Sequence, residues 1–218
     1  MFHISLGPRI ALATSLLAFA SPQSFGQIHA ATPPTAPALS NVAKVAVGSA
    51  HACAVDGSGA LYCWGSNASG QLGVSGIPYS DIPVRVTGMG SGVASVSAGS
   101  GHTCALTTSA TVKCWGSNTN GQLGNGSTID SPTAVNVSGL SGVTALSAGT
   151  DYTCAVANGA ARCWGWNDYR QLGDSTGISR TTPITVNGLS TGVTGIAAGY
   201  QHTCAVLAGG GARCWGWN

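Results

Sequence analysis

The chain has 218 residues, of which only 6% are charged, and a formal net charge of +2. Typical soluble proteins carry about 25% charged residues, so long exposed helices are not expected here. Eight scattered basic residues disfavour binding to nucleic acid or to an anionic membrane, and the 33 glycines with many Ser, Thr, Ala and Val residues favour short strands joined by turns.

The N-terminal segment, residues 1–30, is predicted to be a secretory signal peptide. A basic residue precedes the apolar run Ile10–Ala20, which is too short to span a bilayer. Small residues permit cleavage after Ala20 or after Ala30. We therefore expect a secreted, periplasmic or cell-surface protein with no membrane span once the signal is removed.

Residues 31–41 are rich in Pro, Ala and Thr and are predicted to form a linker. The folded part is expected over residues 42–218, where the sequence repeats itself with a period of about fifty residues. Each copy holds a first cysteine and, nine or ten residues later, a second cysteine followed directly by Trp-Gly. The predicted units are approximately 42–92, 93–142, 143–192 and an incomplete 193–218.

Each unit contains four short runs with the character of strands, separated by Gly, Ser, Asn and Pro clusters. In the second unit these runs are Val93–Ser97, Thr103–Leu106, Val112–Trp115 and Ala134–Val137. Four strands in a repeated unit of this length are typical of a β-propeller blade and not of a helical solenoid. We expect an all-β fold of about three and a half blades of four antiparallel strands.

The third unit predicts the register of its central hairpin. Asn158-Gly159 is a strong signal for a two-residue turn, and counting outward from it places Cys154 opposite Cys163. Directly opposed residues of a non-hydrogen-bonded pair lie about 4.5 Å apart at Cα, a separation that a disulfide can span.

The other units carry one more residue in this hairpin, so three-residue loops centred on Ser58, Ser109 and Gly209 are expected. Such a loop favours glycine at its third position. Gly59 and Gly210 meet that requirement, whereas Ala110 does not.

The eight cysteines are predicted to form four disulfides, because export to an oxidising compartment favours disulfides over thiolate ligands. The predicted pairs are Cys53–Cys63, Cys104–Cys114, Cys154–Cys163 and Cys204–Cys214. The alternatives are free thiols and a set of His/Cys zinc sites, the latter because His51, His102 and His202 each stand two residues before a cysteine. The third unit has Tyr152 at that position, which weakens the metal interpretation, and no metal or cofactor is expected.

Three motifs recur in the same order in each complete unit, and the second unit illustrates them. They are Gly-His-Thr-Cys-Ala-Leu at 101–106, Cys-Trp-Gly-Ser-Asn at 114–118 and Gly-Gln-Leu-Gly at 121–124. With these motifs the chain resembles the regulator of chromosome condensation repeat family over residues 42–218, in a secreted, bacterial-type variant with paired cysteines. The resemblance implies a seven-bladed propeller, so we expect this sequence to be a fragment of one; a complete half-propeller, with its exposed strand edges, would be expected to self-associate.

What the family resemblance implies for function is less specific, because one fold hosts many activities. The nuclear relatives bind chromatin and act as guanine-nucleotide exchange factors on a small GTPase. A signal peptide and paired cysteines disfavour that role here. Secreted bacterial relatives, including a β-lactamase inhibitor protein, imply a surface for binding proteins.

Residues that recur in every unit are interpreted as scaffold, whereas positions that differ between the copies are the candidates for binding. The position after each motif glycine holds Ser66, Ser117, Trp166 or Trp217. Aromatic and arginine side chains are typical of binding hot spots. The candidate binding rim is therefore Trp166, Trp217, Tyr79, Tyr169, Arg85, Arg170 and Arg180. Ordinary loop side chains are the alternative interpretation.

The leading hypothesis for function is an exported, noncatalytic propeller that binds another protein or a cell-envelope component. The alternatives are a secreted hydrolase-type enzyme on a propeller platform and, less favoured, the exchange-factor activity of the nuclear relatives. No catalytic residues are predicted. The chain has no glutamate, and Asp56, Asp130 and Asp174 stand among Gly and Ser residues, where aspartate usually forms turns.

Overall fold

The computed structural model describes residues 39–217, and these residues contain strands and no helix. The predicted signal peptide, and residues 31–38 of the predicted linker, lie outside the described residues. The strands are β1 Val42–Val47, β2 His51–Asp56, β3 Leu61–Ser66, β4 Tyr79–Arg85, β5 Val93–Ala98, β6 His102–Thr107, β7 Val112–Gly116, β8 Ser131–Asn136, β9 Val143–Ala148, β10 Tyr152–Ala157, β11 Ala160–Gly165, β12 Arg180–Thr185, β13 Val193–Ala198, β14 His202–Leu207 and β15 Ala212–Gly216.

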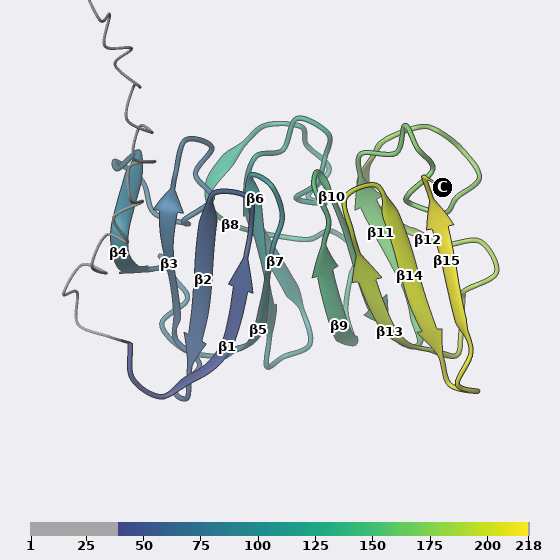
Figure 1. Cartoon of the computed structure of the whole chain (residues 1–218), viewed down its shortest axis with the longest axis horizontal. Coiled ribbons are helices and arrows are strands. Elements are labelled where there is room, and N and C mark those ends of the chain that lie inside the picture. Colours follow the sequence, from purple (N-terminus) through teal and green to yellow (C-terminus); the bar gives the residue numbers. More distant parts are fainter. Residues whose placement is uncertain (1–38, 218) are drawn as a thin grey trace, which may run out of the picture. The chain divides into compact units, whose positions relative to one another are not determined.

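Consecutive strands pair into four antiparallel sheets, each inside one of the expected units (Figure 1). The first three sheets have four strands each, in the orders β1-β2-β3-β4, β5-β6-β7-β8 and β9-β10-β11-β12. Within the described residues the fourth sheet has three strands, β13-β14-β15. The expectation of an all-β fold made of four-stranded blades is confirmed.

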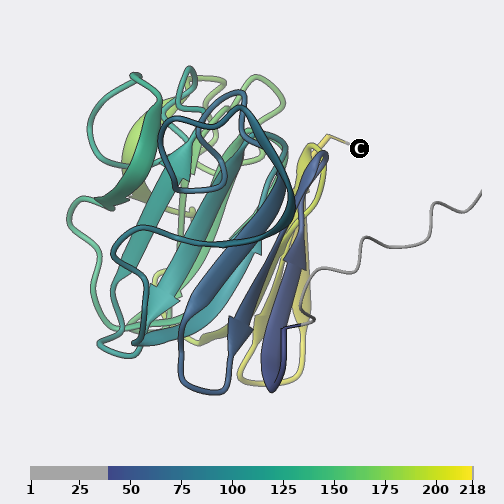
Figure 2. The same ribbon diagram turned by 90° about the vertical axis from the view of Figure 1, so that its left-hand side faces the viewer.

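The sheets pack face to face in chain order, and their first strands lie along one side. β1 contacts β5, β5 contacts β9, and β9 contacts β13. Figure 2 shows dark blue β1 and the yellow strands of the fourth sheet on the same side of the stacked sheets. The core lies between neighbouring sheets: the cluster around the Cys53–Cys63 pair also contains Ala105 and Trp115 of the next blade.

Each of the three blade junctions is built around one indole ring. Trp115, fully buried, donates from Nε1 to the carbonyl of Gln71 in the preceding blade at 2.9 Å. Trp164 and Trp215 make the same bond, at 2.8 Å each, to the carbonyls of Gln122 and Gln171. The interpretation of the recurring Trp and Gln residues as scaffold agrees with these bonds, because each indole N–H removed from water has an acceptor.

The predicted hairpin register is confirmed in the third blade, where Cys154 pairs with Cys163 and Ala157 with Ala160. The predicted fourth strand of the second blade is displaced. We expected it over Ala134–Val137, whereas β8 begins at Ser131. The reason is that Pro132 marks no turn here; it lies on an edge strand, where a missing N–H costs no ladder bond.

The hairpin loop with Ala110 keeps the conformation of its glycine-containing counterparts. Ala110 has φ of 58°, against 80° at Gly59 and 83° at Gly210. An L-residue in this left-handed region costs about 1–2 kcal/mol.

Replacing Ala110 with glycine should therefore stabilise the fold. We expect Ala110→Gly to raise the free energy of unfolding by about 0.5–1 kcal/mol, because relief of the left-handed strain is partly offset by the larger entropy of glycine in the unfolded chain. Urea denaturation measures this change, and Gly210→Ala is expected to produce the opposite shift. A destabilised Ala110→Gly variant would contradict the prediction.

Candidate functional site

The loops between the third and fourth strands of the blades are held rigid by their motif asparagines. In the second blade, buried Asn118 accepts from Leu123 N at 2.9 Å and donates from Nδ2 to the carbonyls of Ser127 and Ile129 at 2.9 and 3.0 Å. Asn67 and Asn167 make the corresponding bonds in their own loops. These loops lie at one end of the blades, the upper end in Figure 1, and together form a rim. The hydrogen bonds of the buried asparagines hold the backbone of this rim in place.

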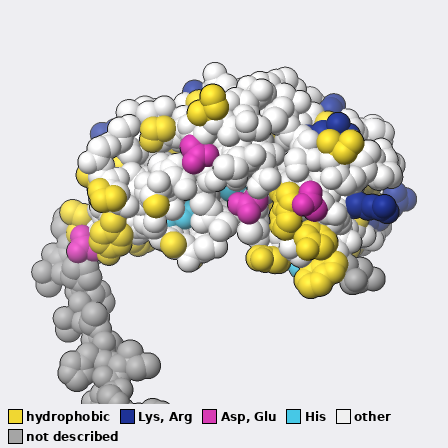
Figure 3. All heavy atoms as spheres, turned by 90° about the horizontal axis from the view of Figure 1, so that it is seen from above, with side chains coloured by type: hydrophobic (Ala, Val, Ile, Leu, Met, Phe, Trp, Pro, Cys, Tyr) yellow, Lys and Arg dark blue, Asp and Glu magenta, His cyan; other side chains and the backbone are white. Residues whose placement is uncertain are grey.

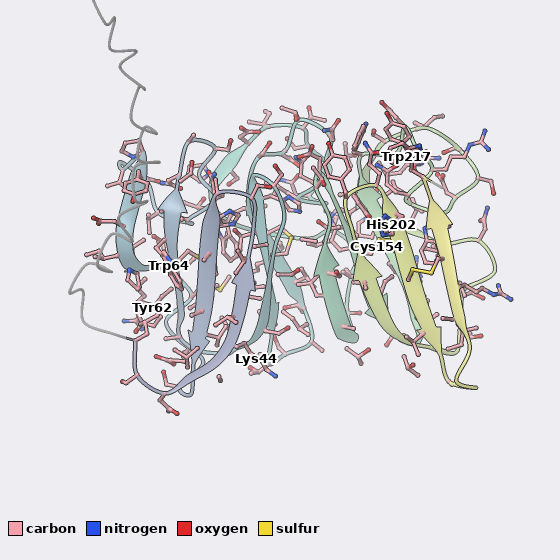
Figure 4. All side chains as sticks on the ribbon, in the orientation of Figure 1. Lys44, Tyr62, Trp64, Cys154, His202 and Trp217 are labelled. Atoms are coloured by element: carbon pink, nitrogen blue, oxygen red, sulfur yellow. A yellow bond between two sulfur atoms is a disulfide. The ribbon has the colours of Figure 1, made fainter. Side chains whose placement is uncertain are left out.

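Residues of two neighbouring blades form a cluster of aromatic rings, which we call the aromatic cluster: Trp166 and Tyr169 of the third loop, and Trp217, which follows β15 in the next blade. The ring centroids of Trp166 and Tyr169 are 5.3 Å apart in an edge-to-face arrangement. Those of Tyr169 and Trp217 are 5.8 Å apart. Tyr169 is 40% exposed and Trp217 64% exposed, so the rings pack against one another on the surface and not in the core. Figure 4 shows Trp217 at the upper end of β15, on the side of the rim.

The aromatic cluster stands on the same backbone framework as the loops of the other blades. The first two blades have Ser66 and Ser117 at the position of Trp166. In each blade the backbone N–H at this position donates to a backbone carbonyl in the turn before the second strand. Trp166 N donates to Asp151 O at 2.9 Å, and Ser117 N donates to Gly101 O at 2.8 Å. The framework tolerates a small side chain at this position, so the indole is not needed for folding.

The buried side-chain amide of Gln171, under the cluster, differs in its hydrogen bonding from that of Gln122 in the preceding blade. The amide Nε2 of Gln122 donates to Ser117 Oγ at 3.3 Å. Gln171 occupies the same place below Trp166, and its Nε2 is buried without a hydrogen-bond partner among the described residues. The large indole at 166 thus replaces a hydroxyl that would satisfy this amide.

Arginine candidates on this rim have two different environments. Arg180 donates to Asp174 Oδ2 from Nε and Nη2, at 3.0 and 2.8 Å, and its charge is neutralised there. Burial by itself would raise the pKa of Asp174, but hydrogen bonds from Thr176, Arg180 and Asn167 lower it to about 2.

Arg170, by contrast, lines an open cleft of about 910 Å³ beside β15, together with His202, Arg213, Trp215 and Trp217. It replaces the glycine that the other loops have at this position and retains a left-handed φ of 61°.

The remaining two candidates lie away from the cluster. Tyr79 begins β4 in the first blade and is 59% exposed. Arg85 ends the same strand at its opposite end, where Nη2 donates to the carbonyl of Gly90 at 3.0 Å. The seven candidates therefore do not form one site: three meet in the aromatic cluster, Arg170 adjoins it, and Arg85 lies near the other end of the blades.

The three histidines considered as zinc ligands have other surroundings. His51 Nε2 lies 2.8 Å from Thr103 Oγ1, whose own proton is donated to the carbonyl of Gln71 at 2.8 Å. His51 must therefore be the donor, with Nδ1 left unprotonated. His102 and Thr153 repeat this arrangement at 2.9 Å, and in the third blade the Tyr152 hydroxyl donates to the carbonyl of His202 at 2.6 Å.

The structure places each cysteine pair directly across its hairpin, at disulfide distance, with Cα separations of 4.0 to 4.1 Å. The paired residues are Cys53–Cys63, Cys104–Cys114, Cys154–Cys163 and Cys204–Cys214. Cys154 and Cys163 carry no exposed surface.

Removal of one bridge tests the pairing. We expect the double variant Cys154→Ala/Cys163→Ala to lose about 2–3 kcal/mol of stability, because a short closed loop no longer restricts the unfolded chain. The unreduced parent protein should bind no alkylating reagent, as judged by mass. Alkylation of all eight thiols without reduction would contradict the pairing.

Two family models described as the regulator of chromosome condensation (RCC1) repeat match nearly all of the described chain. One matches residues 42–71 and 93–122, and the other residues 58–106, 111–156 and 158–206. The chain belongs to the RCC1 repeat family. RCC1 repeats form β-propellers, and the blades described above are such repeats.

Among curated proteins, the chain is similar to the ultraviolet-B receptor UVR8 of Arabidopsis thaliana, with 31% identity over 182 residues that cover 81% of this chain and 41% of the receptor. It is also 34% identical over 176 residues to the human probable E3 ubiquitin-protein ligase HERC3, covering 78% of this chain and 17% of that protein. The chain thus spans less than half the length of these RCC1-repeat relatives.

Solved propellers share the fold. Human WBSCR16 superimposes with a TM-score of 0.73 and 23% identity, covering 82% of this chain and 49% of that chain. Yeast RCC1 (Prp20), in a structure bound to Kap60, superimposes with a TM-score of 0.70 and 23% identity, and the match covers 83% of this chain and 45% of that chain. Among residues 39–217 no helix is long and apolar enough to cross a membrane.

Two acidic residues beside the cluster were not singled out from the sequence. Asp151 lies against Trp166 through the backbone bond already described, and Asp168 precedes Tyr169. The signal was present, since each stands where the other copies have an uncharged residue: Ala50, Gly101 and Gln201 for Asp151, and Ala68 and Thr119 for Asp168.

Proposed function

We propose that this chain is an exported, noncatalytic RCC1-repeat scaffold that binds another protein through the loop rim bearing the aromatic cluster. The observation that carries the proposal is the exposure of Tyr169, packed edge-to-face on Trp166, in a loop where the first two blades have serine or asparagine at both positions. Exposed Trp and Tyr residues on a rigid support lose little entropy on binding and dominate the energetics of protein interfaces.

Export is supported by the predicted signal peptide and by the four cysteine pairs, since disulfides persist in oxidising compartments. A noncatalytic role is supported by the hydrogen bonds of the loop carboxylates. Asp56 Oδ1 accepts from Ser58 N and Ala60 N, and Asp130 Oδ1 accepts from Asn118 N at 2.7 Å. Their replacement by Asn should perturb turns and leave partner binding in place, whereas a carboxylate-dependent hydrolase would lose its activity.

A photo-crosslinking experiment in the cell that produces the chain tests the proposal. Benzoylphenylalanine at position 169 keeps an aromatic ring in the cluster, while the same residue at Ser109, in an exposed hairpin loop at the other end of the blades, serves as the control. We expect one identified protein to be crosslinked from position 169 and not from position 109. Equal crosslinking from both positions, or none from position 169, would contradict the proposal.

The variant Trp166→Ser sharpens this experiment, because Ser66 and Ser117 show that serine suits the framework. It should fold with unchanged thermal stability, since Gln171 gains a hydroxyl partner like that of Gln122. Partner affinity is expected to fall by about 2 kcal/mol, the size of a hot-spot effect. Binding is measured by titration with the crosslinked protein; unchanged affinity would remove Trp166 from the interface.

A further inference from the structure

The aromatic cluster leaves part of its ring surface exposed to solvent, where a cation could contact it. Tyr169 lies between the two indoles, edge-to-face with Trp166 and tilted by 48° to Trp217. Rings inclined to one another in this way present more than one face to a group entering from solvent. The negative face of an aromatic ring attracts ammonium and guanidinium groups.

Two carboxylates belong to segments next to the cluster: Asp151 lies in the turn before β10, where its carbonyl accepts from Trp166 N, and Asp168 directly precedes Tyr169. The carboxylate of Asp151 is half-buried and has no hydrogen bond or ion pair among residues 39–217, and burial raises the pKa of this group. Asp168 is exposed and likewise has no bonded partner in the described chain. Figure 3 shows acidic side chains beside the largest group of hydrophobic side chains on this face.

The nearby positive charges are paired with a carboxylate or lie along the cleft beside β15, which Trp217 also lines. Arg180 is held by Asp174 at 2.8 Å. Arg170 and Arg213 line the cleft beside β15. The residue that supports Trp217 through its carbonyl, Gln201, is uncharged. The cluster therefore combines aromatic rings with two carboxylates, Asp151 and Asp168, that form no ion pair among the described residues.

We propose that the aromatic cluster, with Asp151 and Asp168, is a pocket for a cationic side chain, an arginine in the first place, presented by the partner protein. Arginine fits better than lysine because its planar guanidinium stacks on rings while its N–H groups donate to carboxylates. This inference rests on the proposed function and adds the chemistry of what the rim recognises.

Titration of the whole chain with two short peptides tests the pocket. The probes are acetyl-Ala-Arg-Ala-amide and its citrulline counterpart, which has nearly the same shape without the charge. The indole N–H signals of Trp166 and Trp217 report binding by NMR, and the signals of buried Trp115 and Trp164 report whether the fold is intact. We expect the arginine peptide to shift only the two cluster indoles, with at least tenfold weaker binding of citrulline and loss of affinity at high salt.

Two variants separate the contributions to the pocket. The double variant Asp151→Asn/Asp168→Asn should lower the affinity for the arginine peptide tenfold, while the rings remain in place. Trp166→Ser/Tyr169→Ser, which copies Ser66 and Ser69 of the first blade, should abolish the shifts at Trp217. Equal binding of the citrulline peptide would overturn the inference. So would indole shifts caused by chitotriose, an uncharged sugar that can stack on aromatic rings, and not by the arginine peptide. Crosslinking from position 169 together with such a result would leave the proposed function standing.

Discussion

Lowering the pH from 7.5 to 5 is expected to reduce the free energy of unfolding by roughly 4 kcal/mol, about 2 kcal/mol for each of two buried histidines. Desolvation by burial lowers the pKa of His51 to about 4 and that of His102 to about 3, from the ordinary value of 6.5. The positive charge of His51 adds to the effect on His102. The unprotonated Nδ1 atoms have no acceptor among the described residues that would stabilise an added proton.

The sign follows from the direction of these shifts. A histidine with a depressed folded-state pKa binds protons more readily in the unfolded chain. Its full contribution to the free energy of unfolding is therefore present above pH 6.5. That contribution is lost as the pH falls toward the folded-state pKa, about 4 for His51 and about 3 for His102. The pKa of Asp151 is raised by burial, which acts weakly in the opposite direction. Urea denaturation at both pH values measures the loss.

The third blade supplies a matched control, because Tyr152 occupies the position of His51 and His102. The variant His102→Tyr should fold and should lose only about 2 kcal/mol between pH 7.5 and 5. His202→Gln, which changes an exposed side chain, should retain the whole loss. A parent protein with the same stability at both pH values would show that the two histidines are protonated in the folded state.

The second large effect is expected at the glycine of the Trp-Gly motif. Gly116 has φ of 102°, and a Cβ there would lie 2.5 Å from the carbonyl oxygen of Gly101 and 2.9 Å from the Cα of His102. Both neighbours are backbone atoms of the adjacent strand and its turn, so neither can rotate away. We expect Gly116→Ala to cost about 3–5 kcal/mol, as the sum of a strained φ and an overpacked contact.

Gly139 provides the comparison, because it has a positive φ of 63° and an added Cβ would meet no atom within 4 Å. Gly139→Ala should therefore cost only about 1 kcal/mol, the backbone contribution by itself. Thermal and urea unfolding of the two variants separate steric from conformational cost. Equal losses would mean that the contact at Gly116 relaxes without penalty.

Much of the fold could be predicted from local patterns. Asn158-Gly159 predicted the turn and the pairing of Cys154 with Cys163, which follow from counting along two strands. The fourth strand of the second blade was misplaced, because Pro132 is compatible with an edge strand as well as with a turn. Whether Pro132 belongs to a turn or to an edge strand depends on whether another strand pairs with that side of β8, and the local sequence does not show this.

The candidate site was predicted less well, because its members come together across blades. Tyr169 meets Trp217, a residue of the next blade, and no local spacing indicates that contact. Arg85 and Tyr79 were grouped with these rings by residue type, yet they lie at opposite ends of one strand of the first blade. Asp151 was missed because it carries no motif, although it differs from the residues at the same position in the other copies.

The sequence by itself determined the repeat, the four-stranded unit, the hairpin register and the family, because each depends on residues close together in the chain or on their recurrence. Only the tertiary structure decided which variable side chains share a surface and which buried groups lack partners. Those outcomes depend on how neighbouring blades pack. The same histidine position is a buried donor to threonine in two blades, and an exposed residue in the fourth, where no further blade covers it among the described residues.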